Sequence, residues 1–409
     1  MDAKPQRYLT AAEAAATLGV SLPTLYAYAS RGLVAARKEK GSRTSLYDAH
    51  DVKTLLKRKS RGRHAEAVAS DALHFGTPVL ESALTLIGGG KLYYRGQDAT
   101  ILAERATLED VARLMWECPA SVFAPDNLPP EGISIRRAWL AAATLPAVDR
   151  CLAMLPHIAA LDDAALAEDP VGVQRAGVRL VRLLTAVIAG VPPSAEPAHA
   201  VLARAWKIEP RLAELLRAAL VLIADHELNA SAFAVRVVAA TGVTVYGAAE
   251  AGLAALQGPR HGGQTSRVVA LLKTMAESRD VPAAVRGLVQ SGERLPGFGH
   301  SLYPDDDPRA RFLLDQLARL LPDHPSVRLS LRVAKAAEAA IGKKPNVDFA
   351  LGSIERALDL PGKASLSLFL LGRSVGWIAH LLEQQQSPQL IRPRARYIGP
   401  TPPELTAAG

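Results

Sequence analysis

Apolar residues recur every three to four positions along most of the chain, the spacing expected of α-helices that bury one face. Clear examples are "TLEDVARLMWE", "PRLAELLRAALVLIADHELNASAFAVRVVAAT" and "ASLSLFLLGRSVGWIAHLLEQ". The alternation typical of a strand is brief and is confined mainly to "KLYYRG". From about residue 72 onward the pattern therefore predicts a succession of helices, joined by short loops that are rich in proline and glycine.

Two short helices are predicted near the start of the chain. Thr10 is a candidate N-cap, and Glu13 three residues later completes a capping box. Gly19 is expected to end this helix. Ser21 begins a second helix, which Gly32 closes. Two short helices joined by a turn that contains glycine form a helix-turn-helix pattern.

The next stretch predicts a wing and a third helix. The segment "AARKEKGSRTSLYD" alternates like a two-stranded hairpin around Gly41 and Ser42, and Asp48 and Asp51 open a helix that ends in "KRKSRGR". Residues 8–58 resemble the winged helix-turn-helix domains of the MerR type and of excisionase-like proteins. We therefore expect a small domain over residues 1–58 and a linker over 59–72.

The excess positive charge lies in the first 64 residues. The chain has 48 Lys+Arg and 40 Asp+Glu, of which 13 and 5 fall within residues 1–64, so the remainder is neutral. A basic module favours a polyanion such as DNA. The alternatives are a solvated basic tail and a helical appendage that packs on the main body or on a partner subunit. If the module binds DNA, we expect groove contacts from Ser21, Thr24, Tyr26 and Tyr28, and phosphate contacts from Arg31, Arg37, Lys38, Lys40 and Arg43.

The composition excludes several classes of protein. Hydrophobic residues make up 49% of the 409 positions, enough for a large core, and this length predicts two or three domains. The two cysteines, Cys118 and Cys151, form neither a disulfide framework nor a metal cluster and fit a reducing cytoplasm. The start "MDAKPQRYLT" has no apolar leader, and no stretch reaches the roughly 18 uninterrupted apolar residues of a membrane helix. We expect a cytoplasmic protein without membrane contact.

Five places in the helical region set polar side chains in apolar or glycine-rich surroundings. Glycine beside a histidine lets backbone N–H groups and ligands approach closely. Each place alone is weak, because a histidine on an apolar helix is more often a core residue and a buried arginine can pair with an internal aspartate. The five places are "ADHELNAS" with Asp225, His226 and Asn229 on an apolar helix, "QGPRHGGQT" with His261, "PGFGH" with His300, "KKPNVDFALGS" with Asp348, and "FLLGRSVGW" with Arg373.

Together these residues indicate acid–base chemistry on a small anion. Three histidines and Asp348, without a serine or cysteine nucleophile, suit general acid–base catalysis. Arg309, Arg373 and Arg392 suit a substrate with several carboxylates, because guanidinium binds carboxylate in a bidentate fork. The sequence has no GxGxxG, P-loop or HExxH motif. We therefore expect neither a metal nor a bound cofactor.

The motifs resemble those of one enzyme family. "DHELNAS", "GPRHGG", "PGFGH…DPRA", "PNVDF", "LGRSVGW" and "IRPRARYIGP" occur in the order and approximate spacing of citrate synthases and 2-methylcitrate synthases. With "TPVLESALTLIGGGKLYYRGQDATIL", the resemblance spans about residues 75–400. It implies an all-α fold and a homodimer. The implied large domain covers residues 73–257 and 366–409, and a small domain over 258–365 closes upon it.

The resemblance also implies a role for each polar residue. Six side chains would contact oxaloacetate: His226, Asn229, His300, Arg309, Arg373 and Arg392. Of these, His300 would hydrogen-bond the ketone and Arg392 would reach in from the neighbouring subunit. His261 would donate a hydrogen bond to the thioester oxygen of an acyl-CoA substrate, and Asp348 would remove its α-proton. The implied products are citrate from acetyl-CoA, or 2-methylcitrate from propionyl-CoA, and free CoA.

The chain departs from the family pattern where acyl-CoA would bind. Many relatives carry a basic residue directly after the loop histidine, whereas Ser301 follows His300 in this chain and an acidic run, Asp305, Asp306 and Asp307, comes next. Carboxylates beside a polyphosphate are unfavourable. We therefore expect the CoA phosphates to contact Arg294, Lys343 or Lys344.

Two functions fit this sequence. The first is the condensing enzyme, which the retained set of His261, His300 and Asp348 favours, because a sensor has little reason to keep a catalytic base. The second is a regulator whose synthase-like body binds oxaloacetate or citrate and adjusts DNA binding by the basic module. One chain can carry both activities.

Overall fold

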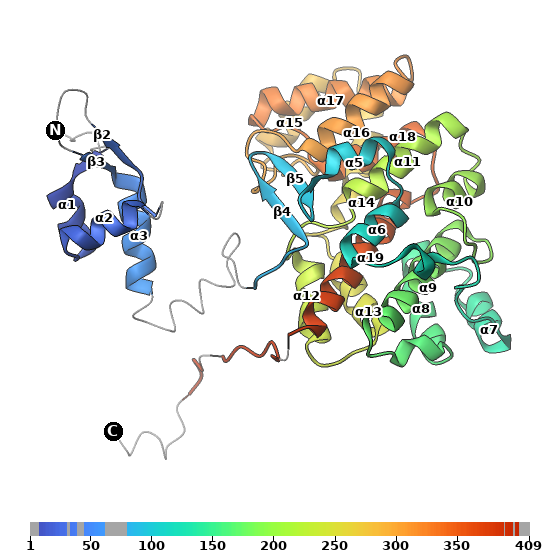
Figure 1. Cartoon of the computed structure of the whole chain (residues 1–409). Helices are drawn as coiled ribbons and strands as arrows, with labels where there is room; N and C mark the ends of the chain where they lie inside the picture. The colour runs from blue at the N-terminus through green and yellow to red at the C-terminus, as the bar shows by residue number, and fades with distance from the viewer. Residues whose placement is uncertain are drawn as a thin grey trace. The chain divides into compact units, whose positions relative to one another are not determined.

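The predicted helices are present in the computed structural model, which describes residues 8–30, 33–38, 45–61, 80–387, 389–395 and 397–400. The chain divides into two units, residues 1–81 and 82–409 (Figure 1). The all-α fold class with a small N-terminal domain is confirmed, although both units also hold a short sheet.

The first unit is a helix-turn-helix with a three-stranded sheet. Its helices are α1 (Ala11–Leu18), α2 (Leu22–Ser30) and α3 (Ala49–Arg61). The strand β3 (Ser45–Asp48) pairs antiparallel with β2 (Ala36–Lys38), as the predicted wing requires. On its other edge β3 pairs with β1 (Tyr8–Thr10), which the sequence does not signal because three residues are too few to show alternation.

The ends of α1 follow the predicted signals. The Thr10 hydroxyl accepts from Glu13 N–H at 3.3 Å and Glu13 Oε2 accepts from Thr10 N–H at 2.8 Å, the two bonds of a capping box. Gly19 ends the helix at φ +61°, in a left-handed conformation that favours glycine. The predicted stop at Gly32 lies outside the described residues. α3 continues to Arg61, into the range expected for the linker.

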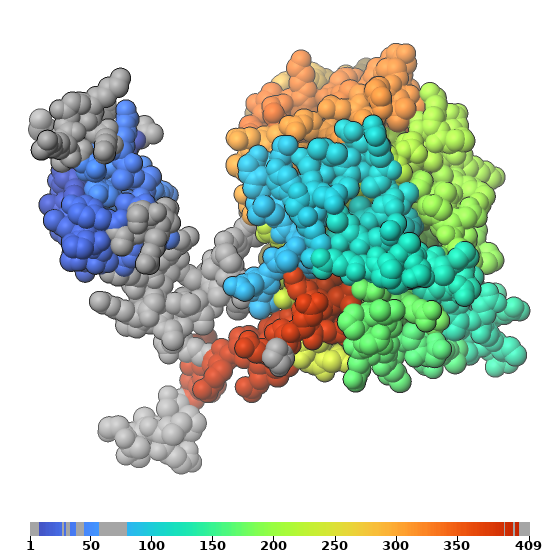
Figure 2. All heavy atoms as spheres, viewed as in Figure 1, coloured from blue at the N-terminus to red at the C-terminus, as the bar shows by residue number. Residues whose placement is uncertain are grey.

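The second unit is almost entirely helical. It opens with an antiparallel sheet of β4 (Thr85–Gly88), β5 (Lys91–Tyr94) and β6 (Gln97–Asp98), in which "KLYYRG" supplies the predicted strand β5. Figure 2 shows β4 and β5, in light blue, at the surface of this unit. The helices are α5 (Ala99–Arg105), α6 (Leu108–Trp116), α7 (Ile133–Ala141), α8 (Ala147–Ala159), α9 (Pro170–Ala189), α10 (Ala198–Ala205), α11 (Pro210–Leu222), α12 (Ala230–Ala239), α13 (Val245–Leu256), α14 (Gln264–Ala276), α15 (Val281–Gln290), α16 (Pro308–Leu320), α17 (Pro325–Ile341), α18 (Val347–Ala357) and α19 (Ala364–Gln385), with short 3-10 turns η1 (Ala120–Phe123) and η2 (Asp163–Leu166).

Helix α19 lies at the centre of the larger of two hydrophobic cores in this unit. It packs against α6, α9, α11, α12 and α13 and is buried on all sides, as its uniformly apolar run predicts. A separate core joins α14, α15, α17 and α18, and Figure 1 shows α15 and α17 at one end of the unit. This second core falls within residues 258–365, and its members include Val268, Leu272, Val285, Val333 and Phe349.

One helix of the described part of the chain, α19, is long and apolar enough to cross a membrane. Its apolar window is 100% buried inside the protein. Central core helices pass the same test of length and composition, so α19 is accounted for as the core of this unit.

Close packing of α13 on α19 predicts a cost for one added methyl group. A Cβ on Gly252 would stand 2.7 Å from two ring atoms of Trp377, and the Trp377 side chain is buried. We expect Gly252→Ala to lower the free energy of unfolding by about 1–3 kcal/mol, the usual cost of overpacking. The readout is the midpoint of thermal unfolding, followed by circular dichroism.

Gly287→Ala is the matched control. Gly287 lies inside α15, and a Cβ there would meet no atom within 4 Å. Alanine stabilises an open helical position relative to glycine, so this variant should melt at or above the wild-type temperature. Equal melting temperatures for the two variants contradict the packing described for α13 and α19.

Candidate active site

Asp225, His226 and Asn229 lie on the loop between α11 and α12, where the sequence analysis wrongly predicts a continuous helix. Glu227 interrupts the helix with a left-handed backbone, φ +51°. Asn229 caps α12, because its Oδ1 accepts from the N–H groups of Ser231 and Ala232, each at 3.2 Å. Apolar residues on both sides continue the helical spacing and conceal the break.

His226 belongs to a cluster of three rings. Its Nε2 lies 3.1 Å from the Tyr303 hydroxyl, and its ring meets the His300 ring edge-on with centroids 4.9 Å apart. Burial, and then the charge of Arg309, hold the pKa of His226 well below its usual value. Burial also raises the pKa of Tyr303 to about 12. Both groups are therefore neutral near pH 7.

The glycines around His300 bring its loop against the segment that leads into α18. Gly299 N–H donates to Lys344 O at 2.8 Å, and Asn346 N–H donates to Gly297 O at 2.8 Å. Gly297 has φ +84°, and a Cβ there would stand 2.9 Å from the Cβ of Phe349. Glycine is required here by both conformation and space. The bare backbone thus places His300 beside the helix that carries Asp348.

The His300 ring has a defined tautomer when it is neutral. Its Nδ1 accepts a hydrogen bond from Leu302 N–H at 3.1 Å, so the ring proton sits on Nε2. Burial, and then the charge of Arg309, lower the pKa of His300 to about 4. Near pH 7 the ring therefore offers one N–H donor, at Nε2.

His261 is positioned by Ser231. The Ser231 hydroxyl lies 2.9 Å from His261 Nε2 and accepts from the Trp377 indole N–H at 3.1 Å. It has one proton, for which His261 and Asn229 compete as acceptors. Burial and the charge of Arg373 lower the pKa of His261 to about 3, so the ring is neutral near pH 7.

Arg309 is held by a neighbouring aspartate. Its Nε donates to Asp307 Oδ1 at 3.0 Å and its Nη2 to Asp307 Oδ2 at 2.8 Å. Asp307 Oδ2 also accepts from Val347 N–H at 3.1 Å, which ties Arg309 to the start of α18. Burial alone would lower the pKa of Arg309, but Asp307 raises it, so the guanidinium stays charged. Its Nη1 has no hydrogen-bond partner among the described residues.

Arg373 lies inside the central helix α19 with fewer partners. Its side chain is 1% exposed. Its Nε donates to Ile223 O at 2.9 Å, whereas its buried Nη1 has no hydrogen-bond partner among the described residues. Burial, and also the charge of Arg309, lower its pKa to about 10. A buried cation with an unused donor is a site that an anion would satisfy.

Asp348 stands in the first turn of α18. Asn346 caps this helix, with its Oδ1 accepting from Asp348 N–H at 3.0 Å. The Oδ1 of Asp348 is buried and has no hydrogen-bond partner in the described part of the chain. Burial raises the pKa of Asp348 to about 7 against the opposing charges of Arg309 and Arg373. The carboxyl group can therefore gain and lose a proton near neutral pH.

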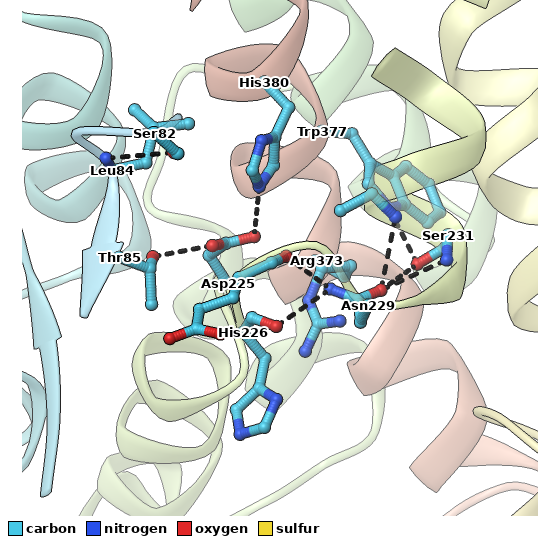
Figure 3. A network of polar contacts seen from close by, with 12 residues as sticks. Ser82, Leu84, Thr85, Asp225, His226, Asn229, Ser231, Arg373, Trp377 and His380 are labelled. Atoms are coloured by element: carbon cyan, nitrogen blue, oxygen red, sulfur yellow. Dashed lines mark hydrogen bonds and ion pairs between the residues drawn. The ribbon is translucent and has the colours of Figure 1, made fainter. Parts of the chain in front are cut away.

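Behind the loop, Asp225 forms a buried polar network (Figure 3). Its Oδ1 lies 3.2 Å from His380 Nε2, and its Oδ2 accepts from the Thr85 hydroxyl at 2.6 Å. Burial alone would raise the pKa of Asp225, but His380 and Arg373 lower it. In Figure 3 the Asp225 carboxylate points toward Thr85 and His380, away from the His226 ring.

Comparison with known families assigns both parts of the chain. The family model for the C-terminal domain of citrate synthase matches residues 135–394, more than half of the chain. The chain belongs to the citrate synthase family. A second family model, a helix-turn-helix domain, matches residues 8–60. The family resemblance stated from the motifs is thereby confirmed.

The relatives of this chain within the citrate synthase family are named either citrate synthase or 2-methylcitrate synthase. A putative citrate synthase 2 of Mycobacterium tuberculosis (strain H37Rv) is 32% identical over 340 residues, 77% of this chain and 88% of that protein. A 2-methylcitrate synthase of Shewanella oneidensis is 28% identical over 369 residues, 79% of this chain and 93% of that protein. The family therefore establishes a citrate synthase-type enzyme and does not choose the acyl group.

Solved structures of citrate synthases share the fold. The citrate synthase of Thermotoga maritima MSB8 superposes with a TM-score of 0.69 at 26% identity, covering 80% of this chain and 95% of that chain. A citrate synthase of Thermoplasma acidophilum, in ternary complex with carboxymethyl coenzyme A and oxaloacetate, gives a TM-score of 0.68 at 25% identity, with coverages of 80% and 95%.

The structure gathers some of the predicted site residues and leaves others apart. Direct contacts join His226 to His300, His261 to Asn229 through Ser231, and Arg309 to the start of α18 beside Asp348. Arg392 lies in the segment after α19, is exposed, and makes no hydrogen bond or ion pair with the described residues. It joins no other member of the set within this single chain.

Of the three candidate CoA contacts, Lys343 has a side chain that packs against the His300 loop. The Lys343 side chain lies along this loop, with its Cδ 2.7 Å from the position of a Cβ on Gly299. Lys344 is exposed and Arg294 is exposed. Two acids of the run are already paired, Asp306 with Arg311 at 2.9 Å and Asp307 with Arg309, and Asp305 is exposed.

The candidate DNA contacts are only partly described. Ser21, Tyr26 and Arg37 are exposed, whereas Thr24 and Tyr28 are half-buried, and the Thr24 and Ser21 hydroxyls lie 2.9 Å apart. Lys38 lies on β2, and its side chain is outside the described residues. Arg31, Lys40 and Arg43 are also outside them.

Two site residues, and the role of a third, escape the sequence analysis. Tyr303 and Ser231 contact the histidines directly, and Asp307 holds Arg309, but none stands out in a run of glycine or apolar residues. For Asp307 the signal was its place two residues before Arg309, at the N-cap of α16. Among the described residues, no group of three or more His, Cys, Asp or Glu side chains is arranged to hold a metal ion.

The raised pKa of Asp348 predicts how stability depends on pH. In the unfolded chain this carboxyl titrates near about 4, so between that pH and about 7 the folded protein holds a proton that the unfolded chain has lost. The contribution of this carboxyl group to the stability of the fold is fully present below the pKa of the unfolded chain, and it is lost as the pH rises through 7. The side chain of Asp348→Asn stays neutral at every pH. Relative to wild type, this variant should therefore become more stable from pH 5 to pH 8, by a free energy of unfolding on the order of a few kcal/mol. The difference between the two melting temperatures, measured at both pH values, reports this change.

Asp315→Asn, an exposed position on α16, is the matched control. Its melting temperature relative to wild type should be the same at both pH values. If Asp348→Asn behaves like this control, Asp348 does not carry the raised pKa.

Proposed function

We propose that this enzyme condenses an acyl-CoA, acetyl-CoA or propionyl-CoA, with oxaloacetate to form citrate or 2-methylcitrate and CoA. The observation that carries the proposal is the buried, unpartnered carboxylate oxygen of Asp348, with a pKa of about 7, in one site with buried Arg309 and Arg373. This condensation needs a base and an anion-binding group in one site. The chemistry also suits the cytoplasm, where both substrates are soluble.

Oxaloacetate would bind on the arginine side. Arg309 has committed Nε and Nη2 to Asp307, and Arg373 has committed Nε to Ile223 O, so each keeps Nη1 for a carboxylate. His226 and Asn229 would complete this half. The exposed Arg392 would supply the third cation to the neighbouring subunit of a homodimer, which accounts for its lack of partners within one chain.

The acyl-CoA would lie between Asp348 and His261. An α-proton of a thioester is a very weak acid, so Asp348 can remove it only if the developing enolate oxygen is stabilised. A neutral His261 supplies that hydrogen bond from Nδ1 when Ser231 donates its proton to His261 Nε2. The role therefore requires the Ser231 proton to face His261 rather than Asn229.

The condensation then follows with each proton placed. Asp348 takes the α-proton, and the carbon of the resulting enolate attacks the ketone carbon of oxaloacetate. The ketone oxygen takes the proton of His300 Nε2 as the carbon–carbon bond forms, and the proton taken by Asp348 then restores His300, so that both groups return to their starting states. Water hydrolyses the resulting thioester and releases CoA.

Water must be excluded until the carbon–carbon bond has formed. The separate core of α14, α15, α17 and α18 suits a smaller domain that closes over the site and opens to release products. We propose that residues 258–365 form this domain.

The CoA phosphates would meet Lys343 and Lys344 beside the His300 loop, with Arg294 as a further contact. The acidic run is less repulsive than its sequence suggests, because Asp306 and Asp307 are each paired with an arginine. Asp305 keeps an unpaired, exposed charge.

The proposal predicts that Asp348→Asn separates turnover from oxaloacetate binding. Loss of a general base should lower kcat by roughly 10²–10⁴-fold. The affinity for oxaloacetate, measured by calorimetry, should change little, because the arginines and histidines remain. CoA release is followed with a thiol reagent, and Asp315→Asn should retain wild-type turnover. Near-normal kcat in Asp348→Asn would refute the proposed mechanism.

DNA binding by the first unit is a second candidate function. The match to a helix-turn-helix family over residues 8–60 favours it, together with the wing formed by β2 and β3 and the excess of basic residues before position 65. In this function, binding of oxaloacetate or citrate to the synthase-like unit would change the DNA affinity of the first unit.

This second function predicts binding to duplex DNA that weakens steeply with salt. Arg37→Ala removes an exposed charge of the wing, so it should weaken binding and flatten the salt dependence. Arg105→Ala, at the end of α5 in the other unit, should bind like wild type. Fluorescence anisotropy with labelled DNA at low and high salt measures both. A wild-type protein without any affinity at low salt excludes this function.

A further inference from the structure

Three carboxylates bind strand β4 and the residues just before it. Ala83 N–H donates to Glu383 Oε1 at 2.7 Å, the Thr85 hydroxyl donates to Asp225 Oδ2 at 2.6 Å, and Ile87 N–H donates to Glu227 Oε1 at 3.2 Å. The N–H groups of Ala83 and Ile87 lie on the edge that faces away from β5, whereas the Thr85 hydroxyl belongs to a side chain and projects from a face of the sheet.

Two of these carboxylates flank a proposed substrate ligand. Asp225 and Glu227 are the immediate neighbours of His226 on the loop between α11 and α12. The Asp225 side chain is completely buried, and its second oxygen is bonded to His380 (Figure 3). The loop cannot move relative to β4 without breaking a hydrogen bond to a buried charge, which is among the stronger bonds in a protein.

The opposite side of the same loop is bound by α19. Arg373 Nε donates to Ile223 O at 2.9 Å, and Gly376 N–H donates to Ala224 O at 3.1 Å. A Cβ on Gly376 would stand 2.4 Å from Ala224 O and 2.6 Å from Asp225 Oδ1. The loop is therefore clamped between β4 and α19, and its backbone carbonyl at Ile223 fixes the direction of the Arg373 guanidinium.

We propose that Thr85 is a positioning residue for oxaloacetate: its hydrogen bond to Asp225 holds the loop so that His226 and Arg373 face the substrate. This inference rests on the proposed function of the site. Thr85 touches none of the reacting groups, so it acts on substrate binding through Asp225 and the loop.

The test compares Thr85→Val with Thr85→Ser in the full-length protein. Valine keeps the shape and leaves Asp225 Oδ2 without its donor, whereas serine keeps the hydroxyl. We expect Thr85→Val to raise the dissociation constant of oxaloacetate, measured by calorimetry, and its KM by about tenfold, the effect of losing one hydrogen bond to a charged group. kcat and the KM for acyl-CoA should change less, and Thr85→Ser should restore most of the affinity.

Thr185→Val is the matched control. The Thr185 side chain is buried in α9, and its hydroxyl donates to Val181 O at 2.8 Å within the helix. This variant should lose thermal stability while keeping wild-type affinity for oxaloacetate. If Thr85→Val also loses only stability, with unchanged affinity, Thr85 is structural and the inference is wrong.

The experiment separates this inference from the function on which it rests. If wild-type protein binds oxaloacetate and releases CoA while Thr85→Val has unchanged affinity, only the positioning role fails. If wild-type protein neither binds oxaloacetate nor releases CoA, the proposed function fails and the positioning role fails with it.

Discussion

Two guanidinium groups buried in an apolar helical body impose the main constraint on this site. A buried charge is costly unless it is paired and its donors are used. Arg309 meets this requirement with the carboxylate of Asp307 in a two-bond fork. Arg373 meets it only in part, with one backbone carbonyl and an unused buried nitrogen. The Asp307 carboxylate and the Ile223 carbonyl satisfy part of these two groups, and the donors that they leave unused define the place for an anion.

Burial, together with the same two charges, sets the protonation state of the other groups. Burial and the nearby arginines keep His226, His261 and His300 neutral, so each can give a hydrogen bond without carrying a charge. The charges of Arg309 and Arg373 lower the pKa of Asp348, but burial raises it by more. A carboxyl group that exchanges a proton near neutral pH, beside neutral donors and fixed cations, has the properties of a general base for a weak carbon acid.

Sequence reasoning reached most of the polar residues of the site because their surroundings are unusual. The glycines beside His300 and the arginine inside an apolar run are both visible in the sequence. In the structure, Gly297 is required because its backbone is left-handed and packs against Phe349, and Arg373 is buried in α19. The break at Glu227 was missed, because apolar spacing continues across it and a single left-handed residue leaves no periodic signal. Tyr303 and Thr85 were missed because their importance comes from partners far away in the sequence. The role of Arg392 depends on a second subunit, so neither the sequence pattern nor one chain alone places it.

The most direct test of the central claim is CoA release by the purified wild-type protein, followed with a thiol reagent, in the presence of oxaloacetate and either acetyl-CoA or propionyl-CoA. The account predicts release that depends on oxaloacetate, and the ratio of the two kcat/KM values identifies the acyl group. A folded protein that releases no CoA from either substrate contradicts the account, even if it binds oxaloacetate.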